Sequence, residues 1–140
     1  MTTDEAIART MQQLGRDAVA AQRVLSNSSG EQRNQALRAA AAALRLHQAG
    51  ILAANERDMS AAAAAGLGRA ALDRLQLDAA RIEAMARGVE DIAALPDPIG
   101  TVLADWTRPN ALHFQRVRVP LGVIGIIYES RPNATCDAGA

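Results

Sequence analysis

Apolar residues recur at three- and four-residue steps in the N-terminal part of the chain, which is the spacing of an amphipathic helix. The first segment with this spacing runs from Thr3 to Leu25 and ends at a turn-forming run of serine and asparagine. The same spacing predicts four further helices, over Glu31–Gly50, Ile51–Ala65, Gly68–Leu77 and Ala79–Leu95. Glycines at or just after the ends of the second and third segments agree with these bounds, because glycine commonly ends helices.

The pattern changes after the proline- and glycine-containing segment Pro96–Gly100. Thr101–Asp105 and Leu112–Val119 read as two strands joined by a turn, which predicts a β-hairpin with one solvated face. Gly122–Tyr128 is apolar at nearly every position, which predicts a strand buried on both faces. Because such a strand needs sheet neighbours and a lone hairpin is marginal, we expect these 140 residues to be the N-terminal part of a larger protein.

Composition and charge exclude several classes of protein. The chain has 15 basic and 15 acidic residues, and this zero net charge does not support a nucleic-acid-binding surface. No apolar run approaches the ~20 residues of a membrane span, and the N-terminus lacks the hydrophobic core of a signal peptide. We therefore expect a soluble cytoplasmic protein without membrane or nucleic-acid partners.

The types of charged and metal-binding residue narrow the chemistry further. All 15 basic residues are arginine, which excludes a catalytic or phosphate-binding lysine within this segment. Charged helix residues such as Arg45 are predicted to lie on solvated faces. The single cysteine excludes an internal disulfide, and His47 and His113 lie far apart, so no metal site is predicted.

The loop Glu129–Asn133 is the candidate functional site, because ligands of open α/β sheets bind at the carboxyl ends of strands. The amide of Asn133 could donate to an oxyanion, although a helix N-cap is the commoner role of such an asparagine. Arg131 is the candidate substrate-binding residue, since it could pair with a carboxylate or phosphate, or it could lie on the surface. Glu129 could act as a base or pair with Arg131.

Three other features receive a structural interpretation. Cys136 lies near a predicted helix start, which would lower its thiol pKa, but no histidine is close in sequence and free cysteines are commonly buried. Gly122 and Gly125 lack the GxGxxG pattern and precede the end of the strand, which favours close sheet packing over phosphate binding. Trp106 and Phe114 flank the hairpin turn, which favours cross-strand packing or an oligomer contact over a stacking site.

The stretch VPLGVIGIIYESRPN, Val119–Asn133, resembles the signature segment of the gamma-glutamyl phosphate reductase family. Members of this family are also called glutamate-5-semialdehyde dehydrogenases and belong to the aldehyde dehydrogenase superfamily. The segment upstream of it, from Asn55, is similar to the same family, and the resemblance is weaker before that residue. The most telling upstream pieces are Ala65–Leu67, Leu72–Leu75, Ala80–Arg81 and Asp97–Gly100.

The resemblance implies an α/β fold of which this chain is a truncated N-terminal part. Residues 1–100 would be the N-terminal helical part of a cofactor-binding domain, and residues 101–119 a β-hairpin of the oligomerisation type. Residues 120–140 would provide the first strand, loop and helix start of an aldehyde-dehydrogenase-like Rossmann domain. The resemblance also implies a homo-oligomer for the full-length enzyme.

The same resemblance implies a reaction. The family reduces L-glutamate 5-phosphate with NADPH to L-glutamate 5-semialdehyde, releasing phosphate, in proline biosynthesis. A cysteine thiolate forms a thioester, which hydride from the nicotinamide then reduces. Asn133 resembles the superfamily asparagine that stabilises the oxyanion, whereas Cys136 does not match the nucleophile. The nucleophile and the NADPH-binding segments belong to later motifs, so the chain alone is expected to be inactive. The alternative hypothesis is a non-catalytic helical interaction module.

Overall fold

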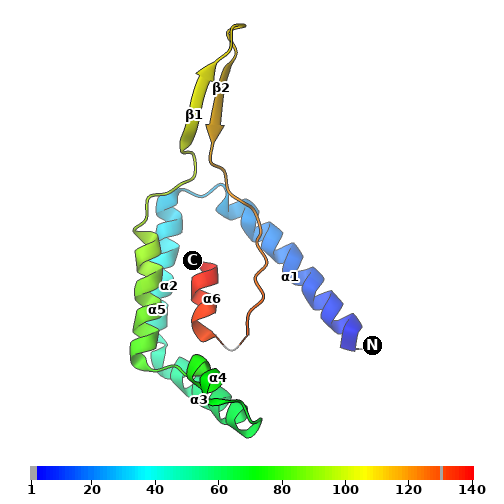
Figure 1. Ribbon diagram of the computed structural model, residues 1–140, viewed down its shortest axis with the longest axis vertical. Coiled ribbons are helices and arrows are strands. Elements are labelled where there is room, and N and C mark those ends of the chain that lie inside the picture. Colours follow the sequence, from blue (N-terminus) through cyan, green and yellow to red (C-terminus); the bar gives the residue numbers. More distant parts are fainter. Residues whose placement is uncertain (1–2, 130) are drawn as a thin grey trace. The chain divides into compact units, whose positions relative to one another are not determined.

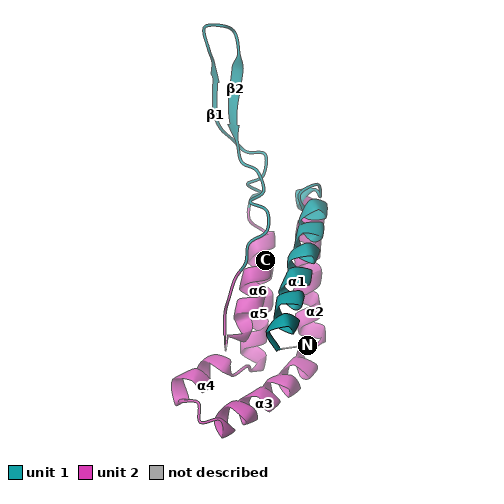
Figure 2. Cartoon of the chain, turned by 90° about the vertical axis from the view of Figure 1, so that its right-hand side faces the viewer, with its two compact units in different colours: residues 1–30, 96–125 teal, residues 31–95, 126–140 magenta. Residues whose placement is uncertain are grey.

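The computed structural model describes residues 3–129 and 131–140, so Ser130 of the predicted loop lies outside the described residues. The elements, shown in Figure 1, are α1 (Thr3–Leu25), α2 (Gly30–Leu46), α3 (Gln48–Ala64), α4 (Arg69–Leu75), α5 (Ala79–Ala93), β1 (Val102–Thr107), β2 (His113–Val117) and α6 (Pro132–Gly139). They divide between two compact units (Figure 2), one of Met1–Gly30 with Pro96–Gly125 and the other of Glu31–Leu95 with Ile126–Ala140.

The helix α1 has the predicted bounds, but the boundary between the next two helices differs from the prediction. α2 ends at Leu46 and α3 begins at Gln48, so Gly50 lies inside α3 and does not cap α2. His47 forms the break, with φ −97° and ψ 12°. Good helix formers on both sides of Gly50 let the helix continue through it. In the part of the chain that the structure describes, none of the helices combines the length and hydrophobicity needed to cross a bilayer.

Local capping groups determine where the later helices begin and end. Asp78 is the N-cap of α5, and its carboxylate accepts a 2.7 Å hydrogen bond from the backbone N–H of Arg81. After α3, Gly66 adopts a φ of +78°, and its N–H donates to the Ala63 carbonyl. The N–H of Leu67 donates to the carbonyl of Ala62, which completes a Schellman motif. The glycine therefore turns the chain sharply from α3 toward α4.

A buried asparagine joins α3 to the connection between α4 and α5. Asn55 lies on α3 and is only 6% exposed. Its side-chain amide donates to the carbonyl of Leu75 at 2.8 Å, and its carbonyl accepts from the N–H of Leu77 at 2.7 Å. These two bonds satisfy backbone groups at the end of α4 that no helix would otherwise pair.

The core of the second unit lies between α2 and α5, which run side by side and antiparallel (Figure 1). Its buried cluster consists of Ala41 from α2 with Ala86 and Val89 from α5, and Cys136 of α6 packs against it. Small alanine side chains allow the helices to approach closely. The predicted apolar stripe of α5 is confirmed at Val89 and at Ile82, which is fully buried.

Arg45, near the end of α2, joins α2 to α5 through two carboxylates. Its guanidinium donates to both oxygens of Glu83, at 2.9 and 3.0 Å, and to both oxygens of Glu90, one of them at 2.8 Å. The hydrogen bonds from Arg45 are the main reason that the pKa of each glutamate is lowered. The prediction that Arg45 is only a solvated side chain is therefore wrong.

Replacing Arg45 with glutamine is expected to return the pKa values of Glu83 and Glu90 to the ordinary carboxyl range. Because the folded-state pKa values are lowered, the network stabilises the fold above the unfolded carboxyl pKa and is lost as the pH falls through the folded values. Titration of the glutamate carboxyl resonances by NMR measures this. Arg38→Gln, which removes the exposed pair with Glu31 on the same helix, is the matched control and should leave both titrations unchanged.

β1 and β2 form the predicted antiparallel hairpin, with Trp106 opposite Phe114. The two rings stack with centroids 5.7 Å apart and planes at 12°, which confirms cross-strand packing. At the turn, Ala111 has a φ of 64°, a conformation unusual for a residue with a side chain. Apart from the half-buried Ala104, all residues of both strands are exposed, so the hairpin has no buried face in the described structure.

The predicted buried strand over Gly122–Tyr128 is not formed. This segment has no regular secondary structure, and Ile127 near its end is fully exposed. A strand requires a hydrogen-bonding neighbour, and none of the described residues pairs with this segment. The prediction of close sheet packing at Gly122 and Gly125 is also wrong, since a Cβ at either position would meet no described atom within 4 Å.

Candidate functional site

A side-chain hydrogen bond links the segment that leads into α6 to the helix itself. The hydroxyl groups of Tyr128 and Thr135 lie 2.7 Å apart. Arg131 occupies the N-cap position with φ −137° and ψ 87°, and Pro132 is the first helical residue. Proline is favoured there because its fixed φ suits a helix and it has no N–H to satisfy. The helix therefore begins before Asn133, and the prediction that Asn133 is the N-cap is wrong.

Asn133 is exposed, and its amide is oriented by a carboxylate one turn along α6. Its Nδ2 donates to Oδ2 of Asp137 at 3.0 Å. A side-chain amide has two N–H donors, so this bond engages one and leaves the second for a ligand. Asn133 thus presents a directed hydrogen-bond donor next to the pocket described below.

A pocket of about 520 Å³ lies between the start of α6 and the segment from α4 to α5. Its wall combines three arginines and two aspartates with apolar side chains. The lining residues are Asp73, Arg74, Gln76, Leu77, Arg81, Ala84, Met85, Arg131, Pro132, Asn133 and Asp137. The structure therefore brings both candidate residues of the predicted loop, Arg131 and Asn133, to the same cavity, with Pro132 between them. Glu129 is not part of the lining, and no ion pair joins it to Arg131 among the described residues.

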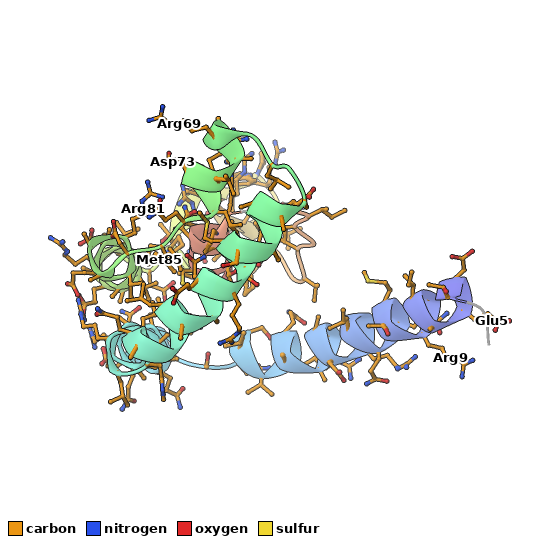
Figure 3. The ribbon with its side chains drawn as sticks, turned by 90° about the horizontal axis from the view of Figure 1, so that it is seen from below. Glu5, Arg9, Arg69, Asp73, Arg81 and Met85 are labelled. Atoms are coloured by element: carbon orange, nitrogen blue, oxygen red, sulfur yellow. The ribbon has the colours of Figure 1, made fainter. Side chains whose placement is uncertain are left out.

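Arg81 holds one wall of the pocket in place (Figure 3). Its Nη1 donates to the backbone carbonyls of Asp73 and Gln76, the second at 2.7 Å, and its Nη2 donates to Oδ1 of Asp73 at 3.0 Å. Three hydrogen bonds from one guanidinium fix the end of α4 against the start of α5. Analysis of single residues in the sequence missed Arg81, although Ala80–Arg81 and Leu72–Leu75 are two of the pieces that carry the family resemblance.

Cys136 does not line the pocket that contains Asn133 and Arg131. It packs against the buried cluster of α2 and α5 and lines a second, mainly apolar pocket of about 440 Å³. Burial raises its thiol pKa, and the negative charge of Asp137 raises it further. The expectation of a lowered pKa is therefore wrong, and the structural interpretation of this residue agrees with its packing. Among the described residues, no group of three or more His, Cys, Asp or Glu side chains could hold a metal ion.

Comparison with known proteins finds relatives of one kind, although not through a family model. No protein-family model matches the chain. The gamma-glutamyl phosphate reductases of Rhodospirillum rubrum and Paramagnetospirillum magneticum are 61% and 55% identical to it over all 140 residues. The chain spans about a third of the length of these relatives, 33% in both cases.

Two solved structures are also similar to the chain. The gamma-glutamyl phosphate reductase of Thermotoga maritima matches with a TM-score of 0.85 and 39% identity, over 88% of this chain and 30% of that one. The gamma-glutamyl phosphate reductase of Saccharomyces cerevisiae matches with a TM-score of 0.85 and 32% identity, over 91% of this chain and 32% of that one. The match is to the N-terminal part of these structures.

Proposed function

We infer, from its similarity over the whole length of the chain to the N-terminal third of gamma-glutamyl phosphate reductases, that this chain is the corresponding part of such an enzyme. The proposed reaction is the NADPH-dependent reduction of L-glutamate 5-phosphate to L-glutamate 5-semialdehyde, with release of phosphate, in proline biosynthesis. The identity of 61% over 140 residues carries this proposal. The chain by itself is proposed to be inactive.

Asn133 is proposed as the catalytic residue that this chain contributes. When a nucleophile attacks an acyl phosphate, negative charge develops on the carbonyl oxygen, and a fixed N–H donor stabilises that charge. The Asn133 amide has one N–H engaged by Asp137 and a second that is available, and the residue lines a pocket large enough for a small substrate. The nucleophile is proposed to come from outside this chain, because Cys136 packs in the core with a raised thiol pKa.

The described residues do not provide a cradle that fits a dinucleotide. Gly122 and Gly125 lie in the irregular segment before α6, and neither lines one of the two pockets described above. A dinucleotide pyrophosphate is normally bound by a glycine-rich turn that connects a strand to a helix. NADPH as the hydride donor is therefore proposed for the whole enzyme, and no step of the reaction is assigned here to residues that would hold it.

One further part of the proposal concerns the assembly, and one observation favours an alternative function. The exposed hairpin, with Trp106 and Phe114 stacked on it, supports a homo-oligomer in which this hairpin is an interface. The alternative function, a non-catalytic helical interaction module, is favoured by one observation. The helix α1 has no buried residue, and its apolar side chains, including Ile7, Met11 and Leu14, are exposed.

The full-length protein is expected to reduce NADP⁺ in the reverse direction, when it is supplied with L-glutamate 5-semialdehyde and inorganic phosphate. Phosphate is required because the reverse reaction forms an acyl phosphate, so omission of phosphate should stop the reaction. The absorbance of the reduced nicotinamide measures the rate. A reaction without phosphate and a reaction without L-glutamate 5-semialdehyde serve as controls. A rate that does not depend on phosphate would contradict the assignment, and no NADP⁺ reduction at all would favour the interaction module.

A further inference from the structure

We propose that Arg74 and Arg131 form an anion-binding site in the pocket beside Asn133, and that this site binds the phosphate or a carboxylate of the substrate. The two arginines come from segments far apart in the sequence, α4 and the start of α6, and both line the same cavity. The identity of the anion depends on the proposed function, because it is taken from the substrate of the proposed reaction. The presence of an anion site itself follows from the pocket.

The two guanidinium groups are available for a ligand. Both side chains are exposed, and neither has a hydrogen-bond or ion-pair partner within residues 3–129 and 131–140. Arginine presents five N–H donors in a planar fork, which matches the oxygens of a phosphate or carboxylate. Two such groups at one cavity therefore favour an anionic ligand over a neutral one.

The other charged groups of the pocket reduce its positive charge but do not reverse it. The third arginine, Arg81, donates to Asp73 and to backbone carbonyls of the α4–α5 connection. The carboxylate of Asp73 therefore faces Arg81, and that of Asp137 accepts from Asn133. The amide of Asn133 is neutral and does not cancel the charge of Asp137, so the three arginines and two aspartates of the lining leave one net positive charge at the pocket. Arg81 acts as a positioning residue, because it holds α4, and with it Arg74, at the wall.

Two groups of the proposed substrate carry suitable oxygens. One is the phosphate that leaves from the reacting carbonyl, and the other is the carboxylate of the amino-acid head. Both would be recognised by the same guanidinium chemistry. Inorganic phosphate and L-glutamate are therefore the two probes that separate the sources.

The test measures binding of each probe to the full-length protein by titration calorimetry at low ionic strength. Arg74→Gln and Arg131→Gln remove the charge with little change in size, and Arg131→Lys retains the charge but not the fork. Arg69→Gln is the matched control, since Arg69 also lies on α4 (Figure 3) but is absent from the lining of the pocket. Loss of one charge-assisted contact is expected to weaken binding by about 10- to 100-fold.

We expect one probe to bind, each glutamine variant to weaken its binding, and Arg131→Lys to restore binding only in part. Weakening of phosphate binding alone identifies the leaving group as the ligand, and weakening of glutamate binding alone identifies the head group. Binding that is equal in Arg74→Gln, Arg131→Gln and the Arg69→Gln control would overturn the site, as would absence of binding by both probes. Because binding is measured without turnover, an inactive protein that still binds an anion through these arginines would contradict the proposed function and not the site.

Discussion

Asn133→Ala in the full-length protein is expected to lower the kcat of the proposed reaction by about 10²- to 10³-fold, the loss seen when one oxyanion-hole donor is removed. The reason is that the amide donor lies at the pocket and has one N–H free for the charge that develops in the transition state. KM is expected to change little, because the interaction forms mainly in the transition state. Steady-state kinetics of the forward or reverse reaction measure both values.

Two variants test the role of Asn133 more sharply. Asp137→Ala removes only the acceptor that orients the amide, so a smaller loss of kcat is expected than for Asn133→Ala. Cys136→Ala should retain most of the activity, since Cys136 packs against the core and lies outside the pocket of Asn133. Full activity of Asn133→Ala would remove this residue from the mechanism. Complete inactivity of a folded Cys136→Ala protein would instead assign the nucleophile to this chain.

Asn55→Ala is expected to destabilise the fold by about 2–4 kcal/mol, because two partly buried backbone groups would each lose a hydrogen-bond partner. These groups are the carbonyl of Leu75 and the N–H of Leu77. Urea unfolding of the full-length protein measures the free energy. Amide hydrogen exchange at Leu77 reports the local effect and should become faster in the variant.

Asn27→Ala is the matched control for this prediction. Its side-chain amide also donates to a backbone carbonyl, that of Arg23 at 2.7 Å, but the bond is exposed to solvent. The expected loss of stability is therefore well under half of that for Asn55→Ala. Similar losses in the two variants would mean that burial of Asn55 contributes nothing to its effect. A slow, unchanged exchange rate at Leu77 in Asn55→Ala would contradict the role of the asparagine in holding the α4–α5 connection.

The sequence predicts well those parts of the fold that local chemistry determines. The bounds of α1, the start of α5 at Ala79 and the hairpin each follow from residues only a few positions apart. The sequence places the break between α2 and α3 at Gly50, because glycine commonly ends helices, but the helix formers on both sides of Gly50 let α3 continue through it. Gly122–Tyr128 was predicted as a strand from its apolar residues, but strand formation depends on a distant partner that a local pattern does not supply.

In the candidate site too, the sequence identifies the residues that are close together in the chain and misses those that only folding brings near. Its loop residues Asn133 and Arg131 could be selected from the sequence, because they follow an apolar segment and carry suitable side chains. The opposite wall could not, because Arg74 and Arg81 come from α4 and α5 and meet the loop only in the folded chain. On a helix surface, an arginine that holds a wall and one that is simply solvated have the same local pattern. The structure distinguishes them through the hydrogen bonds of Arg81.

The exposed segment Val123–Tyr128 has a consequence for how this chain behaves in solution. Five of its six residues have high β-propensity, and it contains no charge and no proline, which is the composition of an aggregation-prone segment. The flanking residues oppose self-association, since Arg118 and Pro120 precede it and Arg131 follows it. Charges and prolines at such positions act as gatekeepers that disfavour stacking between copies. The segment whose residues carry the family resemblance is thus also the one that most needs protection from contact with other chains.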